Sequence, residues 1–182
     1  MKWFFRSIGF IFILFLGLVA VGYFSSSTLK VDRSLSIDAY PEDIYEYLED
    51  LEAFTRWAPW FARDPDANII YGGADFGLGA SVVWRVPGET ADDPALISRE
   101  EIIAAHPPEF IQTSLLLGGE PASATYALSA TDEGTLVYIQ FERELGGFPY
   151  LQRLTKGGRE AALGSEFDSA LERLKTIVET SE

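Results

Sequence analysis

GREAALGSEFDSALERLKTIVE, residues 158–179, has the pattern of one long amphipathic helix. Its apolar side chains recur at helical spacing along one stripe: Leu163, Phe167, Leu171, Leu174 and Val178. Charged side chains, such as Glu172 and Lys175, lie off the stripe. Because most helical stability in proteins comes from packing an apolar face, the rest of the chain must supply a surface for this stripe.

Strand-like runs precede the helix. The stretch 29–37 alternates between apolar and polar residues and predicts a first strand. Two short helices are expected next, at 41–50 and at 51–57, the second stopped by Pro59. Six further strands follow, at 67–71, 79–86, 96–105, 110–117, 123–130 and 135–144, with separators rich in Gly and Pro.

This order of elements predicts an α+β fold. Strands joined by short turns pair antiparallel, and a run of strands followed by a helix is typical of that class. One face of such a sheet must be covered, and only the terminal helix is long enough. A strongly curved sheet around one helix can keep an elongated apolar cavity, where ligands commonly bind.

Composition excludes several kinds of chemistry. The chain has 182 residues, which suits one domain, and no cysteine, which excludes disulfides, thiolate metal sites and cysteine nucleophiles. A single histidine, His106, argues against multi-histidine metal sites and a Ser-His-Asp triad. A net charge of −14 disfavours nucleic acid as a partner. We therefore expect no metal and no cofactor.

The N-terminal residues differ from the rest of the chain. Residues 8–24 are all apolar or glycine, and Lys2 and Arg6 precede them, which predicts a transmembrane anchor with a cytoplasmic N-terminus. The alternative is a cleaved signal peptide. We divide the chain into a cytoplasmic N-terminus at 1–7, an anchor at 8–24, a linker at 25–30 and a domain at 31–182 outside the cytoplasm. The partners expected on this basis are the membrane and other membrane proteins.

Motifs spread over residues 31–180 resemble one protein family. They are RSLSIDAYPEDI at 33–44, WAPWF at 57–61 before Asp64-Pro65-Asp66, YGG at 71–73, GLG at 77–79 with Trp84, Pro107-Pro108 and Gly134-Thr135. In order and spacing they resemble the SRPBCC superfamily (START-like; polyketide cyclase/dehydrase and lipid transport), especially bacterial members with an N-terminal membrane segment. The resemblance implies the helix-grip fold, a curved sheet of about seven strands around the C-terminal helix. It does not by itself specify an activity.

The resemblance implies a hydrophobic small molecule or lipid held between sheet and helix. The residues that would line its site are Val82, Trp84, Tyr126, Leu128, Ile139, Phe141, Leu163 and Phe167, with Trp57, Trp60 and Phe61 near the mouth. The last three could equally be a packed corner of the core.

Charged residues on the fourth strand leave two possibilities open. Alternation turns inward either Arg99 and Glu101 or Ser98 and Glu100. A carboxylate facing an apolar cavity would have a raised pKa and could transfer protons, whereas an outward one would form surface ion pairs. His106 precedes a turn, which gives it neither the burial nor the partner that a general base needs. On the seventh strand, Tyr138 and Gln140 are expected to face outward.

Three functions remain open from sequence. The first is a membrane-tethered domain that binds a hydrophobic ligand without transforming it. The second is a polyketide cyclase/dehydrase-like enzyme that uses Glu101, Arg99 and Tyr126, and the third is an accessory subunit of a membrane complex. An all-apolar cavity would favour binding, a buried carboxylate would favour catalysis, and a cavity filled by Trp84 and Phe167 would favour the subunit.

Overall fold

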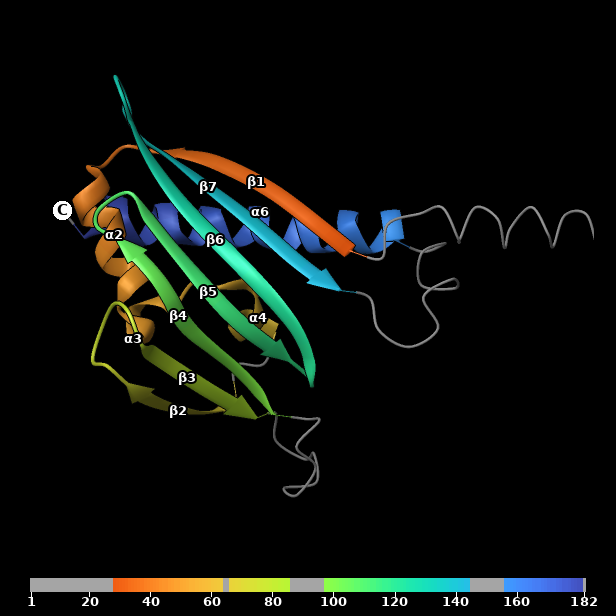
Figure 1. Ribbon diagram of the computed structural model, residues 1–182. Coiled ribbons are helices and arrows are strands. Elements are labelled where there is room, and N and C mark those ends of the chain that lie inside the picture. The colour runs from red at the N-terminus through yellow and green to blue at the C-terminus, as the bar shows by residue number, and fades with distance from the viewer. Residues whose placement is uncertain (1–27, 64–65, 86–96, 145–155, 182) are drawn as a thin grey trace, which may run out of the picture.

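The computed structural model describes residues 28–63, 66–85, 97–144 and 156–181 (Figure 1). Its strands are β1 (Thr28–Ile37), β2 (Asn68–Gly73), β3 (Ala80–Arg85), β4 (Ser98–His106), β5 (Phe110–Leu117), β6 (Glu120–Thr131) and β7 (Gly134–Glu144). Its helices are α2 (Pro41–Glu49), α3 (Leu51–Phe54), α4 (Pro59–Arg63) and α6 (Lys156–Thr180). The predicted strands and the long terminal helix are confirmed. The predicted anchor at 8–24 lies outside the described residues.

The strands form one antiparallel sheet of seven strands within the described part of the chain, in the order β1-β7-β6-β5-β4-β3-β2. Because β1 pairs with β7, the first and last strands in sequence lie side by side. The chain leaves the sheet after β1, forms α2 to α4, and returns at the opposite edge as β2 (Figure 1). This topology, with α6 laid along the sheet, is the helix-grip α+β arrangement.

Helix α6 packs its apolar stripe against one face of the sheet. Phe167, Leu171, Leu174 and Val178 are buried, whereas Leu163 near the start of the helix is half-buried. The sheet offers them the alternate residues of its inner face, which in β6 are Ala124, Tyr126 and Leu128 and in β7 are Val137, Ile139 and Phe141. The predicted packing of the terminal helix against one face of the sheet is therefore confirmed.

An ion pair joins α6 to β1 beside a glycine of the helix. Arg33 points inward from β1, and its Nε lies 2.9 Å from Oδ1 of Asp168 on α6. The guanidinium passes directly over Gly164, where a β-carbon would overlap it. Glycine at this position therefore lets helix and strand approach closely around the half-buried Arg33 side chain.

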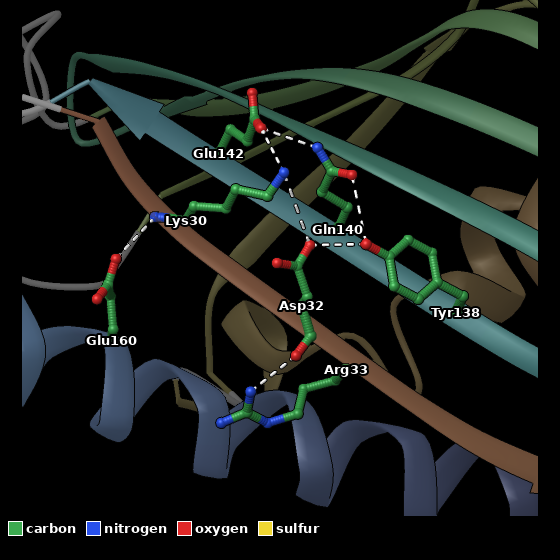
Figure 2. A network of polar contacts seen from close by, with 7 residues as sticks. All are labelled: Lys30, Asp32, Arg33, Tyr138, Gln140, Glu142 and Glu160. Atoms are coloured by element: carbon green, nitrogen blue, oxygen red, sulfur yellow. Dashed lines mark hydrogen bonds and ion pairs between the residues drawn. The ribbon is translucent and has the colours of Figure 1, made fainter. Parts of the chain in front are cut away.

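The outer face of β1 and β7 is polar (Figure 2). Tyr138 donates a hydrogen bond to Asp32 over 2.7 Å, and Gln140 donates to Glu142 over 2.8 Å. Lys30 pairs with Glu142 at 3.2 Å. The expectation that Tyr138 and Gln140 face outward is confirmed, and the alternation along β7 therefore turns Ile139 and Phe141 inward.

The helical segment after β1 differs from the prediction. We expected one helix over 51–57, but α3 ends at Phe54 and a further short helix, α4, begins at Pro59. Proline suits the first position of a helix because it lacks the N–H that would be unpaired there. The break lets α4 turn Trp60 and Phe61 into the interior. In addition, β1 begins at Thr28, three residues before the expected domain boundary at residue 31.

Among the described residues, no helix combines the length and the apolar character needed to cross a membrane.

Candidate functional site

A cavity of about 220 Å³ opens between the sheet, α4 and α6, and we call it the sheet–helix cavity. It is lined by Pro59, Trp60, Trp84, Ser98, Leu117, Gly118, Phe141, Arg143, Leu163, Glu166 and Phe167. Aromatic and aliphatic side chains make most of this wall. The volume lies below the roughly 300–1,000 Å³ typical of small-molecule sites, so the interior is filled more completely than the expected elongated cavity.

The structure brings five of the eleven predicted ligand-binding residues together at this cavity: Trp60, Trp84, Phe141, Leu163 and Phe167. The other six are buried in the core and do not line it: Trp57, Phe61, Val82, Tyr126, Leu128 and Ile139. Trp57, Trp60 and Phe61 thus divide between the two roles considered from sequence, a packed corner of the core and a wall of the ligand site. Trp57 is fully buried against Phe54 and Tyr126, whereas Trp60 belongs to both the core and the cavity wall.

Trp60 and its neighbours form a continuous aromatic wall. Ring centroids lie 6.0 Å apart between Trp60 and Phe167, and 5.5 Å apart between Phe141 and Phe167. Such edge-on and tilted pairs add stability beyond the area that they bury. The wall therefore joins α4, α6 and β7 at one side of the cavity.

The open question on β4 is answered by the burial of Glu100. Glu100 is fully buried on the inner face, whereas Arg99 and Glu101 face solvent and pair with each other at 2.5 Å. The prediction that Arg99 and Glu101 could be catalytic is therefore wrong, because both lie on the opposite face from the cavity. The sequence alone could not show whether Glu100 or Glu101 faces inward, because the neighbouring Ile102 and Ile103 are equally apolar. In the structure only Ile102 is buried.

Glu100 is held by one hydrogen bond. The indole N–H of Trp60 donates to Oε2 of Glu100 over 3.0 Å. The other carboxyl oxygen, Oε1, is buried and has no hydrogen-bond partner among the described residues. The Thr113 hydroxyl lies close enough to lower the pKa of the Glu100 carboxyl, but no hydrogen bond of regular geometry joins the two groups.

Two more buried hydroxyls continue from Glu100 across the sheet. Thr113 on β5 and Tyr126 on β6 both face inward, and neither hydroxyl has a partner among the described residues. Thr113 lies opposite Ile102 and Ala124, so Glu100 and Tyr126 are its diagonal neighbours on the two flanking strands. Long side chains reach each other across such diagonals. We call Glu100, Thr113 and Tyr126 the polar diagonal.

Burial determines the protonation states of Glu100 and Tyr126. Loss of hydration raises the pKa of Glu100 from 4.5 to about 8, and the nearby Thr113 hydroxyl and Trp60 indole oppose the rise only in part. Burial and the nearby Glu100 also raise the pKa of Tyr126. At neutral pH the neutral acid therefore predominates, and Oε1, which accepts no bond from Trp60, is the oxygen expected to carry its proton.

No group of three or more His, Asp or Glu side chains in the described residues could hold a metal ion. His106 is exposed at the end of β4, near the turn to β5, and takes no part in the cavity. What the arrangement offers chemically is a small chamber with aromatic and aliphatic walls that also include Ser98, Arg143 and Glu166, and a neutral carboxylic acid and two hydroxyls behind one of those walls.

Comparison with known proteins identifies the family. The model of the family "Polyketide cyclase / dehydrase and lipid transport" matches residues 28–179, and this chain belongs to that family. The match spans the sheet, the short helices and α6. No curated protein matches the chain in sequence.

Solved structures share the fold at low sequence identity. A protein of unknown function from Staphylococcus aureus aligns with a TM-score of 0.61 at 14% identity, over 85% of this chain and 95% of its own. A protein from Rhodobacter sphaeroides gives 0.59 at 16%, over 87% and 96%. The di-domain ARO/CYC protein StfQ from the steffimycin biosynthetic pathway gives 0.60 at 16%, over 85% of this chain and 52% of its own. These likenesses establish the fold alone.

The buried acid predicts a specific pH dependence of stability. The unfolded chain loses the Glu100 proton near pH 4.5 and the folded chain near pH 8, so between these values the folded state binds more protons. This residue's contribution to the free energy of unfolding should therefore fall by about 3 kcal/mol from pH 5 to pH 8. Denaturant unfolding of the protein and its Glu100→Gln variant at both pH values measures this difference.

The neighbouring carboxylate supplies the control. Glu101→Gln changes an exposed residue on the outer face and should keep the pH slope of the unmodified protein. If Glu100→Gln keeps that slope as well, Glu100 is hydrated and ionised in the folded protein.

Proposed function

We propose that this protein binds a hydrophobic small molecule or lipid between its sheet and α6. The observation that carries the proposal is the aromatic cavity itself, placed beside a buried acid that is only half satisfied. The family binds hydrophobic small molecules in general, which agrees with this placement. Displacing water from such walls favours apolar ligands.

Polar groups at the cavity give the ligand an orientation. Arg143 lines it, and its guanidinium pairs with Glu120 through Nη2 while its buried Nε has no partner among the described residues. Ser98 lines the same cavity and accepts a hydrogen bond from the backbone N–H of Gly118 over 3.2 Å. A few polar groups within an apolar wall are the usual composition of a specific small-molecule site.

Filling the cavity should abolish binding. Leu163→Trp places a large ring at a half-buried position on the cavity wall, so we expect a loss of affinity of at least about tenfold with the fold retained. The measurement is the molar ratio of small molecules that co-purify with the protein, read by native mass spectrometry.

Leu136→Trp is the matched control, because Leu136 lies on the outer face of β7 and is 37% exposed. It should retain the ligand content of the unmodified protein. Equal ligand content in the two tryptophan variants would place the ligand elsewhere and contradict the proposal.

A cyclase/dehydrase-like reaction is the second candidate, and Glu100 is the observation that favours it. Carboxyls with raised pKa values are common at sites of proton transfer. The structural neighbour StfQ is described as an ARO/CYC protein from a biosynthetic pathway. In this chain Glu100 would take the place that sequence analysis gave to Glu101, with Tyr126 as its neighbour.

Proton abstraction next to a ketone tests this second function. Glu100 as carboxylate would remove a methyl proton from 2-acetonaphthone, and the enol would regain a deuteron from D₂O. Exchange, followed by NMR, should become faster as pH rises toward about 8, because the carboxylate form increases. It should fall to the uncatalysed rate in Glu100→Gln and persist in Glu101→Gln. Equal exchange with and without the protein would favour binding without chemistry.

We also propose that residues 8–24 tether the domain to a membrane, on the basis of their uninterrupted apolar sequence after Lys2 and Arg6. The full chain should sediment with membranes and resist carbonate extraction, and a variant lacking residues 1–24 should remain in the supernatant. Release of the full-length chain by carbonate would contradict the tether. Stoichiometric partner chains in the purified membrane fraction would support the accessory-subunit role instead.

A further inference from the structure

We infer that the polar diagonal is an inner subsite, behind Trp60, that binds one uncharged acceptor oxygen of the ligand, such as the oxygen of a ketone. This inference rests on the proposed function, because the apolar remainder of the ligand would occupy the sheet–helix cavity. It adds the chemical class of the ligand, an apolar molecule with a carbonyl group, and the residues that select it.

Three buried oxygens that have no hydrogen-bond partner in the described part of the chain come from neighbouring strands of the sheet. Oε1 of Glu100, Oγ1 of Thr113 and the hydroxyl oxygen of Tyr126 are all buried without a partner. They come from three adjacent strands and lie on the same inner face. Buried polar groups are nearly always hydrogen-bonded, and each exception destabilises the fold. Three such groups on adjacent strands of one face suit a partner that arrives from outside the chain.

The polar diagonal offers hydrogen-bond donors to a ligand. The Trp60 indole can only donate, so Oε2 of Glu100 acts as the acceptor of that bond. In the neutral acid, Oε1 is then the oxygen expected to carry the hydrogen. Thr113 and Tyr126 each carry a hydroxyl hydrogen as well. Three groups able to donate toward one region suit an oxygen that accepts, and a carbonyl oxygen accepts two hydrogen bonds.

Burial of the polar diagonal favours an uncharged ligand group. An anionic group at this depth would lose its hydration and would lie beside the carboxyl of Glu100. The same burial that keeps Glu100 neutral therefore disfavours a carboxylate or phosphate as the bound group. An uncharged carbonyl avoids this loss and still pairs with the buried donors.

Trp60 places the subsite next to the cavity. Its ring lines the sheet–helix cavity, and its N–H bonds to Glu100, which does not line that cavity. The ring therefore stands between the cavity and Glu100. Trp60 belongs to a helix of five residues, α4, and the inference requires a shift of its indole ring that gives the ligand oxygen access to the polar diagonal.

Two probes of matched shape test the inference. 2-Acetonaphthone carries a C=O group where 2-isopropenylnaphthalene carries C=CH₂, so only the ketone can accept hydrogen bonds. Binding to the full chain, solubilised in detergent and labelled with ¹⁵N in its indoles, is followed by NMR. Partition into detergent is the same for every variant, so the ratio of the two affinities can be compared between proteins.

We expect the unmodified protein to prefer the ketone, and Tyr126→Phe to reduce that preference about five- to tenfold, the value of one ordinary hydrogen bond. Affinity for the hydrocarbon should not change. Thr113→Val should act in the same direction. Tyr138→Phe is the control, since that hydroxyl bonds to Asp32 on the outer face, and it should leave the preference unchanged.

Stability measurements separate a lost subsite from a damaged fold. Tyr126→Phe removes a buried hydroxyl without a partner, so the ligand-free variant should unfold at the same or a higher temperature than the unmodified protein. A lower unfolding temperature would show that the hydroxyl already has a partner within the chain, and would overturn the inference.

The remaining outcomes distinguish this inference from the proposed function. If both probes bind to the unmodified protein but Tyr126→Phe leaves their affinity ratio unchanged, the inner subsite is refuted and the apolar cavity stands. If neither probe binds, the proposed binding function fails and the inner subsite fails with it.

Discussion

The packing of α6 against the inner face of the sheet is the interaction on which the rest of the molecule depends. Phe167, Leu171 and Leu174 exclude water from that face almost completely. Only because water is excluded does a glutamate on β4 become a neutral acid, and only then does an unpaired hydroxyl on β6 carry a free-energy cost. The electrostatics of the site is thus a consequence of hydrophobic packing by helix residues about 70 positions further along the chain than Glu100.

Stability and function make opposite demands on this interior. An apolar residue at Thr113 or Tyr126 would remove an unpaired polar atom and so stabilise the sheet, whereas at Glu100 it would also leave the Trp60 indole N–H without its acceptor. Natural sequences that keep such groups at a local cost usually keep them for function. The surrounding core is otherwise consistent, with aromatic and aliphatic side chains on every neighbouring strand. The polar diagonal therefore stands out as the part of the core that folding alone does not explain.

Sequence reasoning could predict the architecture because periodicity encodes it. Alternation in 135–144 set Ile139 inward and Tyr138 outward, and the helical stripe through Phe167 and Leu174 predicted the clasp. It could not predict that Glu100 is the buried acid. Because Ile102 and Ile103 are adjacent and both apolar, the sequence does not show which alternate residues of β4 face inward. The pairing of β4 with β5 is also irregular between Ile102 and Ala104. Nor could it place Trp60, because the Trp60–Glu100 bond joins residues 40 apart in sequence through the unpredicted helix α4.

The two halves of α6 have different roles, and this division bears on how the family varies. Leu171, Leu174 and Val178 in the later half are fully packed, and they hold the helix on the sheet. In the earlier half, Leu163 and Phe167 form a wall of the cavity. A change in the earlier half can therefore reshape the cavity while the later half keeps the helix docked. Structural neighbours near 15% identity share the fold, which is what this division allows, since the residues that define a ligand need not be those that define the fold.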